Sequence, residues 1–143
     1  MAVRKANAVW QGTLKEGSGK LSVQSKIFED AAYSFGSRFE QAEGTNPEEL
    51  IGAAFAGCFS QAFALELEQA GYPPTRIETT AEITLEKAEG GFKISKASLD
   101  TRAQVQAIDE GKFRELAEKA KDNCPVSKAL AGVEKSVQPK LTR

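Results

Sequence analysis

Histidine is absent from the 143-residue sequence, and its absence excludes several kinds of active site. Ser-His-Asp and Cys-His catalysis both use an imidazole to take a proton from the nucleophile. Histidine is also the commonest nitrogen ligand of zinc, and no ligand pair stands at a recognisable metal spacing. We therefore expect no histidine-dependent hydrolase and no metal site. We also expect no bound cofactor, because the sequence carries no recognisable cofactor motif.

Long runs of one charge and long apolar runs are scarce as well. Nineteen basic side chains nearly cancel twenty acidic ones, and no basic run is long enough to bind a phosphate backbone. The N-terminus has no apolar stretch of signal-peptide length, and we expect no segment to reach the roughly 20 apolar residues of a membrane span. The sequence therefore predicts a cytoplasmic protein without nucleic-acid or membrane partners.

Cysteine occurs only twice, at Cys58 and Cys124. Two distant cysteines in a chain without secretory features are more often catalytic, redox-active or inert than a permanent cross-link. Apolar residues make up 41% and charged residues 27%, as in ordinary globular proteins. A chain of this length can bury one core. We expect one domain over residues 1–143.

Short strands are predicted as far as Phe39. The patterns Ala8–Trp10, Leu21–Ser25 and Ala32–Phe35, with a glycine-containing turn at Glu16–Lys20, indicate a small antiparallel meander.

The segment T-N-P-E-E then predicts the start of a long helix. Asn46 can cap it, Pro47 suits its first position, and Glu49 is placed to close a capping box. The helix can continue to Ala70, where Gly71 and two prolines end it. Because its N-terminal half is apolar nearly all the way round, we expect a central helix with a sheet and a second helix beside it.

A hairpin and two helices follow in the C-terminal half. Strict alternation over Arg76–Glu86 predicts a half-buried strand, and the apolar parity of the next strand requires a bulge near Ser95–Lys96. Asp109 is expected to cap a helix that stops at Asn123. A second, short helix is expected over Pro125–Gly132. Val137 and Leu141 suggest a last strand. This order of elements indicates an α+β fold.

Each cysteine has an inert and a reactive interpretation. Cys58, within the apolar helix, would ordinarily be a small packed hydrophobe. Cys124 would ordinarily be a cap or packing residue, although the start of a helix can stabilise a thiolate. Two thiols on two helices are also the minimum for a disulfide cycle, so both interpretations remain open from the residues alone.

A reactive thiolate at neutral pH needs a cation beside it, and without histidine that cation must be Arg or Lys. Arg38 is flanked by Phe35 and Phe39, so its stem can lie on apolar surface while its head enters a pocket. Such a residue is more often an exposed arginine at a strand end, whose stem covers the surface while its head stays in water. Glu48 would ordinarily be an acid that complements the helix dipole.

The stretch RFEQAEGTNPEELIGAAFAGCFSQAFALELEQAGYPP, followed downstream by NCPVSKAL, resembles the osmotically inducible protein C and organic hydroperoxide resistance (OsmC/Ohr) family of thiol peroxidases. The resemblance covers essentially the whole chain. The arginine in R-F-E, just before the helix, is similar to that of the OsmC branch. The resemblance implies an OsmC-like α+β fold, with antiparallel strands around a long central apolar helix, in an intertwined homodimer.

The resemblance also implies roles for four residues. The Cys58 thiolate attacks the O–O bond of an organic hydroperoxide, which releases the alcohol and leaves a sulfenic acid, and Cys124 resolves that acid to a disulfide. Arg38 favours the thiolate and stabilises the developing alkoxide, while Glu48 orients Arg38. An external dithiol, for which a lipoyl-type compound is suspected, would reopen the disulfide.

Glu48 and Cys58 are ten residues apart on one predicted helix, a separation of about 15 Å at 1.5 Å per residue. An arginine joining them within one chain would be at the limit of its reach. We therefore predict that Arg38 and Glu48 serve the Cys58 of a second chain in a homodimer.

Phenylalanines near the thiol, namely Phe35, Phe39, Phe55, Phe59 and Phe63, predict a preference for apolar peroxides over hydrogen peroxide, although each is also explained by core packing. Two other functions remain open. One is a non-catalytic, stress-associated ligand-binding dimer with packed cysteines. The other is a different thiol enzyme, which the lack of a C-x-x-C spacing and of a base beside either cysteine disfavours.

Overall fold

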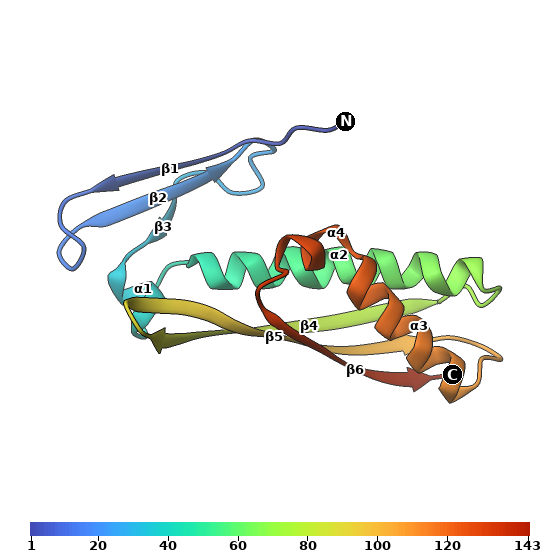
Figure 1. Ribbon diagram of the computed structural model, residues 1–143. Coiled ribbons are helices and arrows are strands. Elements are labelled where there is room, and N and C mark those ends of the chain that lie inside the picture. The colour runs from blue at the N-terminus through green and yellow to red at the C-terminus, as the bar shows by residue number, and fades with distance from the viewer. The chain divides into compact units, whose positions relative to one another are not determined.

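The computed structural model describes all residues, 1–143, as an α+β protein with two compact units, Met1–Leu50 and Ile51–Arg143 (Figure 1). The boundary falls inside a helix. The expectation of a single domain is not tested by this division and stays a prediction. The two units are described in turn.

The first unit contains the predicted meander. Its three strands pair antiparallel in the order β1-β2-β3, with bounds β1 Ala6–Gln11, β2 Ser18–Val23 and β3 Ala31–Tyr33. Gly19 on β2 lets two aromatic rings meet across the strand, since a Cβ there would lie 2.3 Å from the Tyr33 ring and 2.7 Å from Trp10. The two ring centroids are 5.4 Å apart. The ring pair gives this sheet an aromatic surface next to the following helix.

That following helix, α1 (Phe35–Phe39), was not predicted, and the expected strand over Ala32–Phe35 is wrong beyond Tyr33. Ser34 and Ser37 form a reciprocal cap: the Ser37 amide donates to the Ser34 hydroxyl at 3.1 Å, and the Ser34 amide donates to the Ser37 hydroxyl at 2.8 Å. The aromatic residues favour a strand by local propensity, and the cap overrides it. Arg38 consequently lies in the last turn of a helix.

The long helix α2 (Pro47–Gln69) begins and ends close to the predicted residues. The Asn46 carboxamide oxygen accepts the Glu49 amide at 2.8 Å, as expected of a cap. The predicted capping box is wrong in one detail, because the Glu49 carboxylate accepts from the Thr45 hydroxyl at 2.8 Å. Gly71, at φ +91°, follows the helix in the left-handed conformation that glycine adopts without strain.

Helix α2 is long and apolar enough to cross a membrane by length and composition, so the expectation that no segment reaches this size is wrong. The same property is found in core helices of soluble proteins. Here the side chains with 0% exposure repeat every four residues on one face, at Phe55, Phe59, Phe63 and Leu67. This periodicity indicates a core helix, while the opposite face, with Ala53, Ala54 and Gly57, is open in the single chain.

The second unit carries a mixed sheet of β4 (Arg76–Ala88), β5 (Gly91–Gln104) and β6 (Glu134–Thr142). β4 and β5 pair antiparallel, and Ser95 is the extra residue between the pairs Thr84↔Lys96 and Leu85↔Ile94, so the predicted bulge is confirmed. β6 runs parallel to β5, which corrects the expectation of antiparallel strands for this pair. The reason is that two helices connect them as a crossover.

These two helices are α3 (Glu110–Asn123) and α4 (Pro125–Ala129). Asp109 caps α3 through the Lys112 amide at 2.8 Å, as predicted, whereas α4 ends at Ala129 rather than at Gly132. Together with α2 they lie over one face of the sheet (Figure 1). The core forms between these layers, where the rings of Phe63 and Phe113 approach to 5.3 Å between centroids.

A chain of hydroxyl groups fixes α2 on the sheet. The hydroxyl oxygens of Ser60 on α2 and Thr79 on β4 are 2.8 Å apart, and those of Thr79 and the fully buried Thr101 on β5 are 2.9 Å apart. Buried hydroxyls need such partners, so sliding of the helix along the sheet would leave them unsatisfied. Cys58, two residues before Ser60, is thereby held in place.

Candidate active site

The two cysteines, both reduced, are neighbours in the second unit. Cys58 lies midway along α2 and is half-buried, whereas Cys124, between α3 and α4, has 0% exposure. Burial is the main cause that raises the pKa of the Cys124 thiol above its ordinary value, and the adjacent Cys58 side chain raises it further. The structure therefore brings together two thiols that stand 66 positions apart in the sequence.

Cys124 joins two helices through its own backbone and side chain. Its amide donates to the Ala120 carbonyl at 3.1 Å and ends α3, and its sulfur accepts the Ser127 amide at 3.3 Å and caps α4. The amides of Ser127 and Val126 lower the pKa of the Cys124 thiol, each by less than burial raises it, and the net shift is a rise. The helix start was expected to favour a Cys124 thiolate. Burial and the adjacent Cys58 side chain oppose it, so the pKa is raised and Cys124 is a neutral thiol at pH 7.

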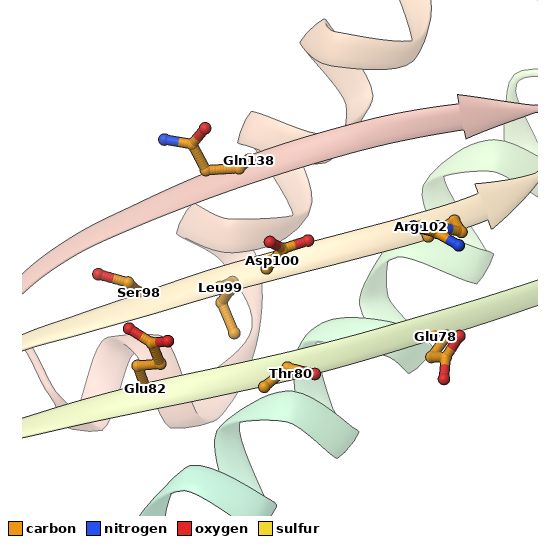
Figure 2. A pocket seen from close by; sticks show the side chains of 8 residues that line it. All are labelled: Glu78, Thr80, Glu82, Ser98, Leu99, Asp100, Arg102 and Gln138. Atoms are coloured by element: carbon orange, nitrogen blue, oxygen red, sulfur yellow. The ribbon is translucent and has the colours of Figure 1, made fainter.

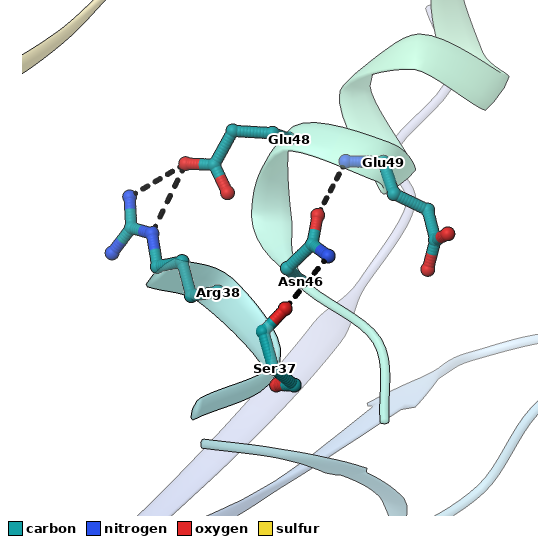
Figure 3. A network of polar contacts seen from close by, with 5 residues as sticks. All are labelled: Ser37, Arg38, Asn46, Glu48 and Glu49. Carbon is teal, nitrogen blue, oxygen red and sulfur yellow. Dashed lines mark hydrogen bonds and ion pairs between the residues drawn. The ribbon is translucent and has the colours of Figure 1, made fainter. Parts of the chain in front are cut away.

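Arg38 and Glu48 form an ion pair in the first unit (Figure 3). Arg38 donates from Nε at 3.0 Å and from Nη2 at 2.8 Å, both to Glu48 Oε1. The guanidinium carbon also lies 5.2 Å from the centroid of the Phe39 ring. Glu48 is 7% exposed and the Arg38 side chain 39%. The carboxylate is thus a buried anchor that holds a cation at the surface of the unit.

The turn between α1 and α2 sets the geometry of this pair. Asn46 donates from its side chain to the Ser37 carbonyl at 3.1 Å while it caps α2 (Figure 3). The Ser37 hydroxyl donates to the Thr45 carbonyl at 2.8 Å. Sequence reasoning identified Asn46 only as a cap and missed Ser37; the S-x-x-S pattern at Ser34–Ser37 is the signal that could have revealed it.

An apolar pocket of about 200 Å³ opens beside the arginine. It is lined by residues of β1, the β1–β2 turn, β3 and α1, namely Trp10, Leu14, Tyr33, Ser34, Phe35, Arg38 and Phe39. Of the five phenylalanines expected near a thiol, Phe35 and Phe39 line this pocket. Phe55, Phe59 and Phe63 have 0% exposure and belong to the core of the second unit. The pocket therefore has aromatic walls and one positively charged group, the guanidinium of Arg38.

One carboxylate oxygen in the first unit lacks a partner. Glu48 Oε2 is buried and makes no hydrogen bond, although buried carboxylate oxygens are normally satisfied. The single chain therefore leaves one acceptor of the ion pair available to a donor.

A second hollow, of about 520 Å³, lies on the outer face of the β4-β5-β6 sheet (Figure 2). Its lining is almost entirely polar and includes Glu78, Glu82, Asp100 and Arg102. The pKa of Glu78 is lowered by a hydrogen bond from Arg76, as in any surface ion pair. The hollow contains no thiol, and no group of three or more metal-ligating side chains occurs in the structure. We assign it no part in the site.

Comparison with known proteins adds independent findings. The model of the OsmC-like protein family matches residues 40–138. The chain is 46% identical to peroxiredoxin OsmC of Escherichia coli, over 89% of each chain. It is 34% identical to organic hydroperoxide resistance protein OhrB of Bacillus subtilis, over 65% of this chain and 67% of that one. The crystal structure of that OhrB matches with a TM-score of 0.67 at 24% identity, over 96% and 98% of the two chains, and shows the same fold.

Proposed function

Because the chain belongs to the OsmC-like protein family and is a thiol-dependent peroxidase, we propose that it reduces organic hydroperoxides to alcohols through a sulfenic acid on Cys58 and a Cys58–Cys124 disulfide. The observation that carries this proposal is that the two thiols are neighbours inside the second unit, where Cys58 packs against the buried cluster that contains Cys124. We place this reaction in the cytoplasm, where dithiol reductants keep such disulfides turning over.

The reaction balances with these two thiols and one dithiol. The Cys58 thiolate attacks the distal peroxide oxygen, the O–O bond breaks, and the alkoxide takes a proton and leaves as the alcohol. Cys58 is then a sulfenic acid. The Cys124 thiol condenses with it, so that an S–S bond forms and water leaves. A dithiol, for which we propose a lipoyl-type compound, returns the two electrons and restores both thiols.

Arg38 and Glu48 supply the electrostatic part of the mechanism in this proposal. A guanidinium beside Cys58 favours the thiolate and stabilises the negative charge that develops on the leaving oxygen. The Nε and Nη2 groups of Arg38 both donate to Glu48 Oε1, so the carboxylate holds the guanidinium in position before the peroxide arrives.

We further propose that Arg38 and Glu48 serve the Cys58 of a second chain. Ten residues of helix separate Glu48 from Cys58, about 15 Å along the axis, which is too far for one short contact. Two features of the single chain support a second copy. The face of α2 with Ala53, Ala54 and Gly57 is open, and Glu48 Oε2 lacks a hydrogen-bond donor. A homodimer would cover the first and can supply the second.

The experiment that tests the disulfide cycle is a count of free thiols in unfolded protein, before and after one equivalent of an alkyl hydroperoxide per chain. Two free thiols per chain are expected before the addition and none after it, since each chain forms one disulfide. If both thiols survive the hydroperoxide, the chain is the non-catalytic ligand-binding protein that the sequence left open.

The aromatic pocket predicts the kind of peroxide that is preferred. In Phe35→Ala, KM for a bulky hydroperoxide such as cumene hydroperoxide is expected to rise by about tenfold, because apolar contact with the organic group is lost. The rate with hydrogen peroxide, which has no organic group, should stay the same. Phe92→Ala, at the exposed start of β5, is the matched control and should change neither value. Equal losses with both peroxides would contradict the assignment of the pocket.

A further inference from the structure

The two sulfurs differ in how an external reductant can reach them. Cys58 is partly exposed, and a thiol that reacts with a peroxide needs such access. Cys124 has 0% exposure, and the flanking side chains of Ala117, Ala120 and Ser127 are 0%, 0% and 2% exposed. All of these residues belong to the buried core of the second unit or lie beside it in that unit. Any further packing of protein on it can only reduce the exposure of Cys124.

The backbone of Cys124 is held from both sides. It ends α3 through the Ala120 carbonyl at 3.1 Å, and its own carbonyl accepts the Lys128 amide of α4 at 3.2 Å. The Cys58 thiol, with which the proposed disulfide forms, is already a neighbour of the Cys124 thiol. Exposing Cys124 would instead require the junction of α3 and α4 to open. The disulfide therefore keeps one accessible sulfur and one enclosed sulfur.

Thiol–disulfide exchange has a strict geometry. The attacking sulfur, the attacked sulfur and the leaving sulfur lie nearly in a line, so the reductant must approach from the side opposite the leaving group. Attack on Cys58 with Cys124 as leaving group can follow the route by which the peroxide reaches Cys58, which is partly exposed. Attack on Cys124 would need an approach through the buried cluster to which Cys124 belongs.

We propose that the reductant opens the Cys58–Cys124 disulfide only at the Cys58 sulfur, so that the mixed disulfide forms on Cys58 and Cys124 leaves; this inference rests on the proposed function. A reductant thiolate bonds to the Cys58 sulfur, and the S–S bond breaks with its electron pair going to Cys124, which takes up a proton. The second thiolate of the reductant then attacks the reductant sulfur of the mixed disulfide. Cys58 leaves as a thiolate, and the reductant closes its own disulfide.

The enclosed leaving group also protects the mixed disulfide. The Ser127 amide donates to the Cys124 sulfur at 3.3 Å and favours its departure, whereas burial of the thiol opposes it. The direction of attack is therefore decided by access and not by the pKa of the leaving thiol. Burial then raises the pKa of the Cys124 thiol, so that it is protonated and attacks back slowly. The mixed disulfide on Cys58 therefore lasts long enough for the second thiol of the reductant to act.

A monothiol can trap the intermediate, since it has no second thiol with which to finish the reaction. The full-length wild-type protein is oxidised with one equivalent of alkyl hydroperoxide, exposed briefly to glutathione, and quenched with N-ethylmaleimide in guanidinium chloride, which exposes Cys124 to the maleimide. Trypsin then releases Cys58 in residues 39–76 and Cys124 in residues 122–128, which mass spectrometry distinguishes. At the earliest times, we expect glutathione on Cys58 to exceed glutathione on Cys124 by at least about tenfold, with maleimide on Cys124.

The control is the same oxidised protein unfolded in guanidinium chloride, where both sulfurs are exposed and glutathione should appear on both peptides. If glutathione in the folded protein appears first on Cys124, or equally on both peptides, the proposal is overturned and the peroxidase cycle still stands. If the hydroperoxide forms no disulfide at all, the proposed function fails, and this inference fails with it.

Discussion

Replacing Cys58 with serine is expected to abolish hydroperoxide reduction, with a loss of at least about 1,000-fold in kcat/KM. A serine hydroxyl is not ionised at neutral pH and is a far weaker nucleophile than a thiolate toward peroxide oxygen. The measurement is the initial rate with an alkyl hydroperoxide and dihydrolipoamide. Normal rates in Cys58→Ser would show that the peroxidatic residue has been assigned wrongly.

Cys124→Ser separates the second step from the first. The variant should consume one equivalent of hydroperoxide per chain and then accumulate oxidised Cys58, since no thiol remains to condense with the sulfenic acid. Dimedone labelling of residues 39–76 detects the sulfenic acid. Sustained turnover at the wild-type rate, with the same dithiol, would mean that Cys124 takes no part in the cycle. Ser127→Ala, which keeps the amide that bonds the sulfur, is a suitable control for the local structure.

Arg38→Ala is expected to lower the rate constant for oxidation of Cys58 by about 100-fold at pH 7, because the cation that stabilises the thiolate and the leaving oxygen is lost. Glu48→Gln should lose less, since the arginine remains but its carboxylate anchor is gone. Arg76→Ala is the matched control: it breaks an exposed ion pair with Glu78 at 3.0 Å and should leave the rate unchanged. A normal oxidation rate in Arg38→Ala would remove Arg38 from the mechanism.

Mixing two inactive variants tests whether Arg38 acts across chains. If it does, a dimer of one Arg38→Ala chain and one Cys58→Ser chain has one intact site, with Arg38 from the second chain and Cys58 from the first. Random exchange of subunits makes half of the dimers mixed, so about a quarter of wild-type activity should return. If Arg38 serves the Cys58 of its own chain, no intact site forms, and the mixture stays as inactive as its components.

The sequence by itself determined the local features of this protein. Asn46, Asp109 and Gly71 predicted helix ends because caps depend on a few adjacent residues. The bulge at Ser95 followed from a change of parity, since side chains on a strand alternate strictly. The lack of histidine left Cys58, Cys124 and an arginine as the candidates for the reactive groups. The helix ends and the bulge follow from the spacing of residues that are close together in the sequence.

The tertiary structure alone decided what depends on residues far apart in the chain. It made β6 parallel to β5 and formed α1 where aromatic residues favoured a strand. It divided the phenylalanines between core and pocket, because burial depends on which elements pack together. It also enclosed Cys124 completely, so that the pKa of the thiol is raised in spite of the amides at its helix start, and the thiol stays neutral. The pKa of the thiol depends on how far solvent is excluded from every side, and the residues next to Cys124 in the sequence do not determine this.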